Sequence, residues 1–382
     1  MYRGCGDRWH GRHGSNSPRK RRRVKIIPVG DRDGLAEFVE FPWTVYRGDP
    51  LWVPPLREQV LYELSGRNAF ARYGRIRPFL CEADGRIAGR IAASINPRLV
   101  DANGAVFGQL GYFECVNEPA IASALIDAGL DWLKAQGITQ VVGPMNGGAI
   151  RPHRFLTRGF DRAPYLFEPR NPPYYPTLFE RSGFVPVSRW YGYELTRQQA
   201  EDHWRRLDRV LERRPSPFQP QELMTGQSPD TLVRVHRLMD RCWAGHVGYA
   251  PLDFDEFAEV FAGLLAIMGP GHVVSLVREG EDGGFAFIYP DYADDVRALQ
   301  GDATGWGRWL GASRPGRIVL STAALTPDAR RSSTASAIMA WAFRRAVTDG
   351  FTDVVVSLVV EGFLAKVGDL TREYALYGRA LR

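Results

Sequence analysis

The sequence predicts an α/β fold, a mixed sheet with helices on its faces, built twice along the chain. A unit of strand, turn, helix and strand occurs at 107–143 and again at 317–358. The two leading strands begin 210 residues apart, and the glycines that end the two helices, Gly137 and Gly350, lie 213 residues apart. A hairpin pattern precedes each unit. The same elements at a near-constant offset indicate two copies of one fold.

The first copy is predicted from its turns and its apolar periodicity. Asp84-Gly85 is a strong hairpin signal, and Gly137 stops a helix whose apolar residues recur every three or four positions. In order, the pattern predicts a strand at 24–29, a helix at 33–48 that Pro42 kinks or breaks, hairpin arms at 78–83 and 86–95, a strand at 105–115, a helix at 118–136 and a strand at 140–143.

The chain between the two units is rich in proline. Residues 144–173 form a long segment with six prolines, and long loops in compact domains are often functional. A short helix and turn at 174–184 leads to a closing strand at 185–195. The second copy is then predicted from helices at 229–244 and 253–268, hairpin arms at 273–278 and 285–289, and the second strand–helix–strand unit.

Composition and charge exclude several classes of protein. Apolar residues make up 45% and charged residues 24% of the 382 residues, as in soluble globular proteins. Residues 1–25 hold seven Arg and two Lys against Asp7, a charge of +8, so the remaining chain sums to −2. A nucleic-acid-binding body is therefore not expected, except through the basic tail. Scattered cysteines and the lack of an apolar run predict a cytoplasmic protein without a metal site or membrane span.

A phosphate-binding turn is predicted where the strand from Arg317 leads into the second helix. The residues at this turn are small or basic, namely Arg330, Arg331, Ser332, Ser333, Thr334 and Ala335. A helix N-terminus offers free N–H groups and the positive end of the helix dipole to a phosphate. Arginine opposes that dipole, so basic residues there indicate an expected anion. An ordinary amphipathic helix with a basic first turn is the alternative.

This turn resembles the acyl-CoA-binding motif of the GNAT acyltransferase superfamily, R-x-x-G-x-G/A. Arg330 takes the basic position and Ala335 the second small position, whereas Ser333 stands where the first glycine is usual. The resemblance implies that residues Arg330 to Ala335 hold the pyrophosphate of acetyl-CoA or another acyl-CoA. It also implies a backbone N–H donor for the thioester oxygen near 322–324.

The first copy resembles the same superfamily in a different segment. Residues 172–184 match the late helix-and-turn pattern N-x-x-A-x-x-L-Y-E-K-x-G-F, with Gly183 and Phe184 at its end. Phe179 stands where many members carry a tyrosine that protonates the leaving thiolate. The turn at 115–120 has no basic residue, so this copy is expected to have a degenerate CoA turn.

Longer patterns over 24–382 are similar to bacterial tandem-GNAT proteins of largely unassigned activity. Among them are Trp52-Val-Pro-Pro-Leu56 and Gly143-Pro-Met-Asn146. The expected organisation is a disordered basic tail at 1–23, a GNAT-like domain at 24–195, a helix and linker at 196–230, and a GNAT-like domain with the candidate acyl-CoA site at 231–382.

Four residues outside the turn are candidates for chemistry or substrate binding. In GNAT enzymes a carboxylate at the position of Glu114 accepts a proton from the attacking amine, and Tyr377 is a candidate acid. Asn146 and Asp291 are candidate ligands of the acceptor. The structural alternatives are an exposed strand-end glutamate, tyrosine packing, and turn formation by Asn146 and Asp291.

The resemblance implies an acyl-CoA-dependent N-acyltransferase. An amine of a small molecule or peptide attacks the thioester directly, and the CoA is held by the C-terminal copy. Two alternatives stay open: a non-catalytic CoA-sensing or scaffold protein, and a Fem-type transferase that uses aminoacyl-tRNA, in which the basic run at 19–23 touches RNA.

Overall fold

The computed structural model describes residues 24–223, 229–362 and 367–381. The basic tail expected at 1–23 and part of the expected linker lie outside the described residues. The N-terminal half contains β1 (Val24–Pro28), α1 (Arg32–Glu40), α2 (Pro42–Val45), α3 (Arg57–Leu64), η1 (Ala69–Arg72), β2 (Arg75–Ala83), β3 (Arg86–Val100), β4 (Val106–Cys115), α4 (Pro119–Ala135), β5 (Gln140–Gly143), β6 (Phe155–Arg158), α5 (Tyr175–Arg181) and β7 (Val185–Thr196).

The C-terminal half repeats much of this order. It contains α6 (Arg197–Arg213), β8 (Gln219–Glu222), α7 (Pro229–Trp243), α8 (Phe254–Ala266), β9 (Val273–Arg278), β10 (Glu281–Pro290), α9 (Ala293–Ala298), η2 (Ala303–Gly305), β11 (Arg317–Leu325), η3 (Ala329–Arg331), α10 (Thr334–Thr348), β12 (Asp353–Val360) and β13 (Asp369–Ala380).

The described strands form one thirteen-stranded mixed sheet. Its order is β1-β2-β3-β4-β5-β13-β7-β12-β11-β10-β9-β8, with β6 paired to β13 off this path. The pairs β4–β5 and β11–β12 are parallel, each joined by a crossover helix, and the other neighbours are antiparallel. The predicted α/β fold with a mixed sheet is confirmed.

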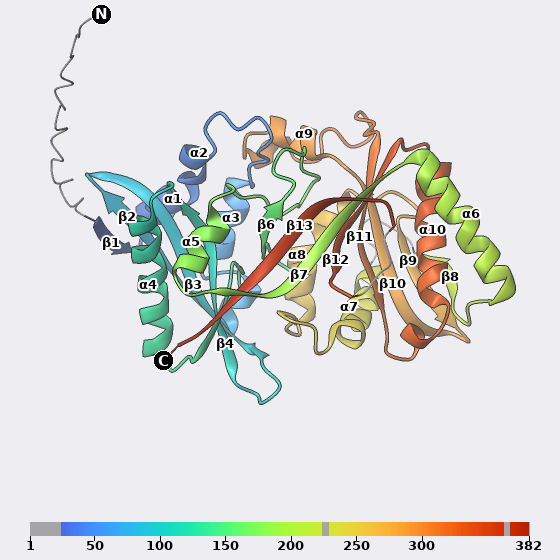
Figure 1. Ribbon diagram of the computed structural model, residues 1–382, viewed down its shortest axis with the longest axis horizontal. Coiled ribbons are helices and arrows are strands. Elements are labelled where there is room, and N and C mark those ends of the chain that lie inside the picture. Colours follow the sequence, from blue (N-terminus) through green and yellow to red (C-terminus); the bar gives the residue numbers. More distant parts are fainter. Residues whose placement is uncertain (1–23, 224–228, 363–366, 382) are drawn as a thin grey trace, which may run out of the picture.

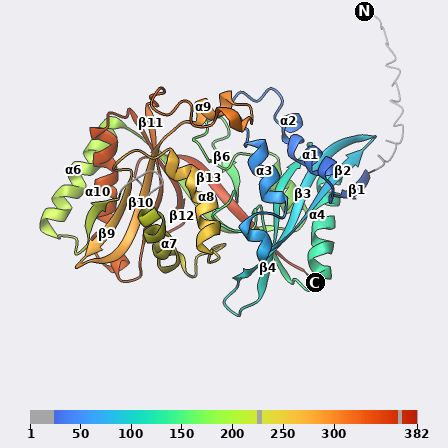
Figure 2. The same ribbon diagram turned by 180° about the vertical axis from the view of Figure 1, so that it is seen from behind.

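The two halves exchange strands at the centre of the sheet. β13 leaves the C-terminal half and pairs with β5, Tyr377 lying opposite Gly143. β7 in turn pairs with β12, Leu195 lying opposite Val354. Figure 1 shows β13 crossing toward α4, and Figure 2 shows the same path from behind. Strand pairing therefore runs across the expected boundary at 195, which stays a prediction.

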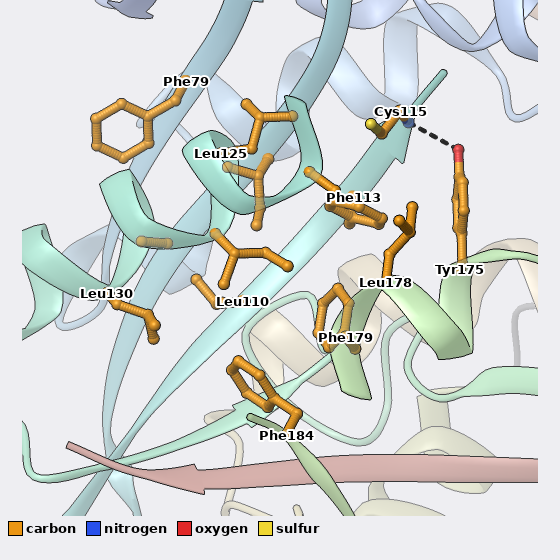
Figure 3. Packing of buried hydrophobic residues seen from close by; sticks show 14 of the residues in the cluster. Phe79, Leu110, Phe113, Cys115, Leu125, Leu130, Tyr175, Leu178, Phe179 and Phe184 are labelled. Carbon is orange, nitrogen blue, oxygen red and sulfur yellow. Dashed lines mark hydrogen bonds between the residues drawn. The ribbon is translucent and has the colours of Figure 1, made fainter. Parts of the chain in front are cut away.

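Helices cover both faces of the sheet. In the C-terminal half, α6 and α10 pack with one set of strand residues, and α7 and α8 pack with the alternate set (Figures 1 and 2). In the N-terminal half, α4 and α5 pack against β4, where Phe113, Leu125 and Phe179 meet in a core (Figure 3). Gly129 lets the helix approach closely, since a Cβ there would lie 2.6 Å from Leu110 Cδ2.

Several expected elements agree with the structure, whereas α3, α9 and the short strands β6 and β8 were missed. The first helix ends at Glu40, and Pro42 starts a separate short helix, as its missing N–H and fixed φ favour. The helix expected at 118–136 is α4. The loop at 144–173 contains the four-residue strand β6, and the expected linker contains β8. Neither is long enough to show a periodic pattern, and both are ordered by pairing with distant strands.

Candidate functional site

The N-terminal strand–helix–strand unit opens where β4 and β5 part. Their pairing runs from Phe107 to Gln109. Beyond it, the Tyr112 N–H donates to Asn146 Oδ1 at 2.8 Å, with Tyr112 at a positive φ of 49°. A Cβ at Gly111 would lie 2.4 Å from the same oxygen. The amide oxygen of Asn146, a predicted substrate ligand, is thus engaged in closing this gap.

Glu114 lies just beyond the gap, at the end of β4. Its carboxylate accepts hydrogen bonds from Tyr175 Oη at 2.7 Å and from Tyr46 Oη at 3.4 Å. Burial raises the pKa of this carboxyl to about 7, although Arg90 and the two tyrosines act in the opposite direction. A carboxyl group that exchanges its proton near neutral pH is suited to general base catalysis.

The two tyrosines hold the carboxylate of Glu114 in place. Tyr175 Oη also accepts a hydrogen bond from the Cys115 N–H at 2.8 Å (Figure 3), and the Tyr46 ring stacks on Trp52 with centroids 4.7 Å apart. Burial raises the pKa of both hydroxyls well above 10, so both remain protonated donors. The sequence did give a signal for Tyr175, because it replaces the alanine of the late helix-and-turn pattern.

Phe179 and Tyr377 lie together in the N-terminal core. Phe179 is fully buried, with its ring centroid 5.1 Å from that of Phe113 and 6.4 Å from that of Tyr377. The Tyr377 hydroxyl donates to Glu180 Oε1 at 3.2 Å, and burial together with Glu180 raises its pKa to about 12. Tyr377, a predicted acid, is thus placed by β13 in the half opposite the predicted CoA turn.

The predicted CoA turn lies between β11 and α10. Arg330 folds back over it, since its Nε donates to Leu325 O at 2.9 Å and its Nη2 to Cys242 O at 2.5 Å. Its Nη2 also lies 3.2 Å from His246 Nε2. The guanidinium therefore ties the end of β11 to the end of α7. Arg331 is exposed, and its N–H donates to Asp328 O at 3.4 Å, whereas its side chain makes no hydrogen bond or ion pair within the described part of the chain.

The hydroxyl groups of this turn are also engaged with protein atoms. Ser332 Oγ donates to Ala329 O at 2.9 Å, and Ser333 Oγ donates to Pro215 O at 2.9 Å. Thr334 is buried, with its hydroxyl 3.3 Å from Ser216 Oγ, while Ala335 is half-buried. A phosphate at this turn would have to be held by Arg331 and by backbone N–H groups, or would have to displace these contacts.

The segment predicted to supply the thioester donor lies beside a second gap. Pairing of β11 with β12 ends at Leu320. The Thr326 N–H bonds to Gly283 on the β10 side, whereas Leu325 O faces the other side, toward Arg330. Since backbone groups alternate along a strand, the N–H of Ala323 also faces the side that β12 has left.

The carboxylate of Asp291 is fully engaged in contacts within the protein. Its Oδ1 accepts from the Leu166 N–H at 2.8 Å and from the Ala293 N–H at 3.1 Å, while its Oδ2 lies 2.5 Å from Arg317 Nη2. These contacts tie the 144–173 loop to the C-terminal half. The acceptor role predicted for Asp291 stays a prediction.

Glu114 and the turn at Arg330 belong to different parts of the sheet. Four strands, β5, β13, β7 and β12, separate β4 from β11. With strands about 4.8 Å apart, β4 and β11 are separated by about 24 Å. The two predicted sets of residues therefore form two separate candidate sites.

Neither a metal cluster nor a membrane-spanning helix occurs in the part of the chain that the structure describes. No group of three or more His, Cys, Asp and Glu side chains in residues 24–223, 229–362 and 367–381 could hold a metal ion. In the same residues no helix is long and apolar enough to cross a bilayer.

Two curated proteins are similar to this chain along most of its length. A bacterial ceramide synthase of Caulobacter vibrioides is 25% identical over 293 residues, which cover 75% of this chain and 76% of that protein. Protein YghO of Escherichia coli K12 is 24% identical over 289 residues, covering 73% of this chain and 72% of that protein. No family model matches the sequence.

Solved structures identify the fold. A tandem GNAT protein from the clavulanic acid biosynthesis pathway superposes with a TM-score of 0.52 at 10% identity, over 94% of this chain and 98% of that one. A probable N-acyltransferase from Enterococcus faecalis V583 superposes with a TM-score of 0.54 at 10% identity, over 94% and 73%. This chain has the tandem GNAT fold, and the resemblance seen in the sequence is confirmed at that level.

Proposed function

We propose that the protein is an acyl-CoA-dependent N-acyltransferase whose chemistry takes place in the N-terminal half. The observation that carries this proposal is Glu114, a carboxyl group with a pKa of about 7 at the gap between β4 and β5. The tandem GNAT fold and the relative named as a ceramide synthase support the reaction class.

In this reaction the acceptor nitrogen attacks the thioester carbon, and the carbon–sulfur bond breaks without an acyl-enzyme. Glu114 accepts the proton that the amine loses. Tyr175 and Tyr46 orient the carboxylate toward the acceptor through their hydrogen bonds. The departing CoA thiolate is protonated from solvent, since Phe179 at the usual acid position has no hydroxyl.

The acceptor is an amine of a small molecule, a peptide or a lipid. The first two classes follow from the resemblance seen in the sequence. The third follows from the name of the Caulobacter vibrioides relative. Acetyl-CoA and longer acyl-CoAs are both candidate donors.

The proposal has two versions, which differ in whether the reacting acyl-CoA binds to the C-terminal half or to the N-terminal half. The sequence predicts the turn at 330–335. In the structure, however, Arg330 and the serine hydroxyls of this turn already bond to protein atoms. This favours a structural or CoA-sensing role for the C-terminal half, with the reacting acyl-CoA at the N-terminal gap.

Calorimetric titration with acetyl-CoA and a long-chain acyl-CoA tests both versions. If the reacting CoA lies in the N-terminal half, Gly111→Ala should weaken binding while Arg331→Glu leaves it intact, because the added methyl group would displace Asn146 and Met145 at the gap beside β4. The reverse result would place the CoA at the predicted turn. Absence of binding and of amine-dependent thiol release by the unaltered protein would reject the acyltransferase proposal.

A further inference from the structure

Arg154 is a buried arginine without an oxygen partner. It closes the loop between β5 and β6, where its N–H donates to Pro144 O at 2.9 Å. The residue is 8% exposed. Its Nε and Nη1 are buried and have no hydrogen-bond partner within the described part of the chain, and its Nη2 lies against His153 Nε2.

The other buried arginines of the described residues all reach oxygen acceptors. Arg372 Nη1 donates to Glu194 Oε1 at 2.7 Å, and its Nε lies 2.8 Å from Glu168 Oε1 as an ion pair. Arg90 Nη1 donates to Phe38 O at 2.7 Å. Buried charges are retained in proteins when they are paired, so the lack of a partner at Arg154 requires an explanation.

The surroundings of Arg154 suit an anion. The guanidinium lies over the Trp190 ring, 4.1 Å from its centroid, which fixes the plane of the cation. Burial and the neighbouring Arg154 charge lower the pKa of His153 well below its ordinary value, so the ring is neutral. The carboxylate of Glu168 is engaged elsewhere, because it accepts a hydrogen bond from Tyr374 Oη at 2.5 Å and pairs with Arg372.

The backbone at Arg154 is itself strained. Its φ is +70°, in the left-handed region that a long side chain rarely adopts. The loop that it closes is pinned by Asn146 N–H to Pro152 O at 3.1 Å and by a bridge between Met145 and His153. Residues with such backbone strain are enriched at ligand-binding and active sites, which agrees with a binding role for this loop.

We propose that Arg154, stacked on Trp190, binds a compact oxyanion, the carboxylate or phosphate group of a small ligand. The free Nε and Nη1 donate to the oxyanion, which supplies the missing counter-charge. The site lies on the loop that also carries Asn146, immediately after β5. The inference does not depend on acyl transfer, because it concerns the binding of an anion by the resting protein.

Thermal unfolding of the full chain in sodium chloride, sodium acetate and sodium phosphate, at equal ionic strength and pH, tests the proposal. The variant is Arg154→Met, and the matched control is Arg158→Met, an exposed arginine on β6. We expect acetate or phosphate to raise the melting temperature of the unaltered protein and of R158M, and R154M to bind the anion at least about ten-fold more weakly. Acetate alone would indicate a carboxylate ligand and phosphate alone a phosphate ligand.

The melting temperature in chloride gives a second readout. Because R154M removes an unpaired buried charge, it should melt at or above the temperature of the unaltered protein. Arg154→Lys should keep a weaker response to the anion. Equal anion effects on R154M and the unaltered protein would overturn the proposal. So would failure of R154M to fold, since either result assigns Arg154 a structural role.

Discussion

The raised pKa of Glu114 leads to a quantitative prediction for stability. The pKa is about 7 in the folded protein against an ordinary value of 4.5. Between these values the folded state holds the proton more tightly than the unfolded state. The contribution of this group to the free energy of unfolding is therefore largest below pH 4.5 and is lost as the pH rises through 7.

The size of the effect follows from the pKa difference. A rise from 4.5 to about 7 corresponds to about 3 kcal/mol, and this is an upper value because Glu114 is partly exposed to water. Glu114→Gln cannot ionise. The free energy of unfolding of the variant, relative to the unaltered protein, should therefore rise by up to about 3 kcal/mol between about pH 4.5 and about pH 8.

Urea unfolding of both proteins across this pH range measures the difference. Glu37→Gln, which removes an exposed carboxylate on α1, is the control and should show no comparable pH dependence. Parallel stability curves for E114Q and the unaltered protein would refute the reasoning, since Glu114 would then titrate alike in both states. The same pKa predicts that amine acylation rises with pH through about 7 and is lost in E114Q.

Three further substitutions test the packing around the candidate sites by urea unfolding. Phe179→Ala should cost about 3–5 kcal/mol, because it leaves a cavity in the N-terminal core. Gly111→Ala should cost at least about 1–3 kcal/mol, since its Cβ would overlap Asn146 Oδ1. Asp291→Ala should cost about 3–5 kcal/mol, because Arg317 and the Leu166 N–H lose their buried partner, and limited proteolysis should then cut within 144–173 faster.

Each of these substitutions has a matched control of the same chemical class at an exposed or unobstructed position. For Phe179→Ala the control is Val187→Ala, which truncates a side chain that is 48% exposed on β7. For Asp291→Ala the control is Asp161→Ala, which removes an exposed carboxylate on the 144–173 loop. Gly30→Ala adds a methyl group where no atom lies within 4 Å. Each control should change the free energy of unfolding by less than about 0.5 kcal/mol. Losses as large as those of the core variants would show that the packing argument is wrong.

Local elements were predictable from the sequence because their signals are local. Pro42, Gly137 and the Asp84-Gly85 turn each impose a backbone geometry on their own neighbours, and α4 follows from its apolar spacing. The order of strands was not predictable, because β13 pairs with β5 from more than 200 positions away in the chain. The apolar periodicity of a segment does not specify the distant strand with which that segment pairs.

In the candidate sites, too, the residue types were predictable from the sequence but their tertiary contacts were not. Glu114 was a candidate through its place on the central strand, but its pKa depends on Tyr46, Tyr175 and Arg90, which come from three other segments. Conversely, Arg330 matches a phosphate-binding motif, yet its side chain is directed by carbonyls of Leu325 and Cys242. A motif specifies which groups are present, whereas the tertiary fold decides what they bond to.

The exchange of β7 and β13 also bears on how the chain is made. Synthesis proceeds from the N-terminus, so β5 cannot pair with β13 until the residues around Tyr377 have been translated. Until then the edge of β5 is open and exposed to mispairing. Neither half can complete its sheet alone, because the C-terminal half takes β7 and the N-terminal half takes β13. Folding of the two halves should therefore be late and mutually dependent, and a cut between them should yield fragments that are stable only when combined.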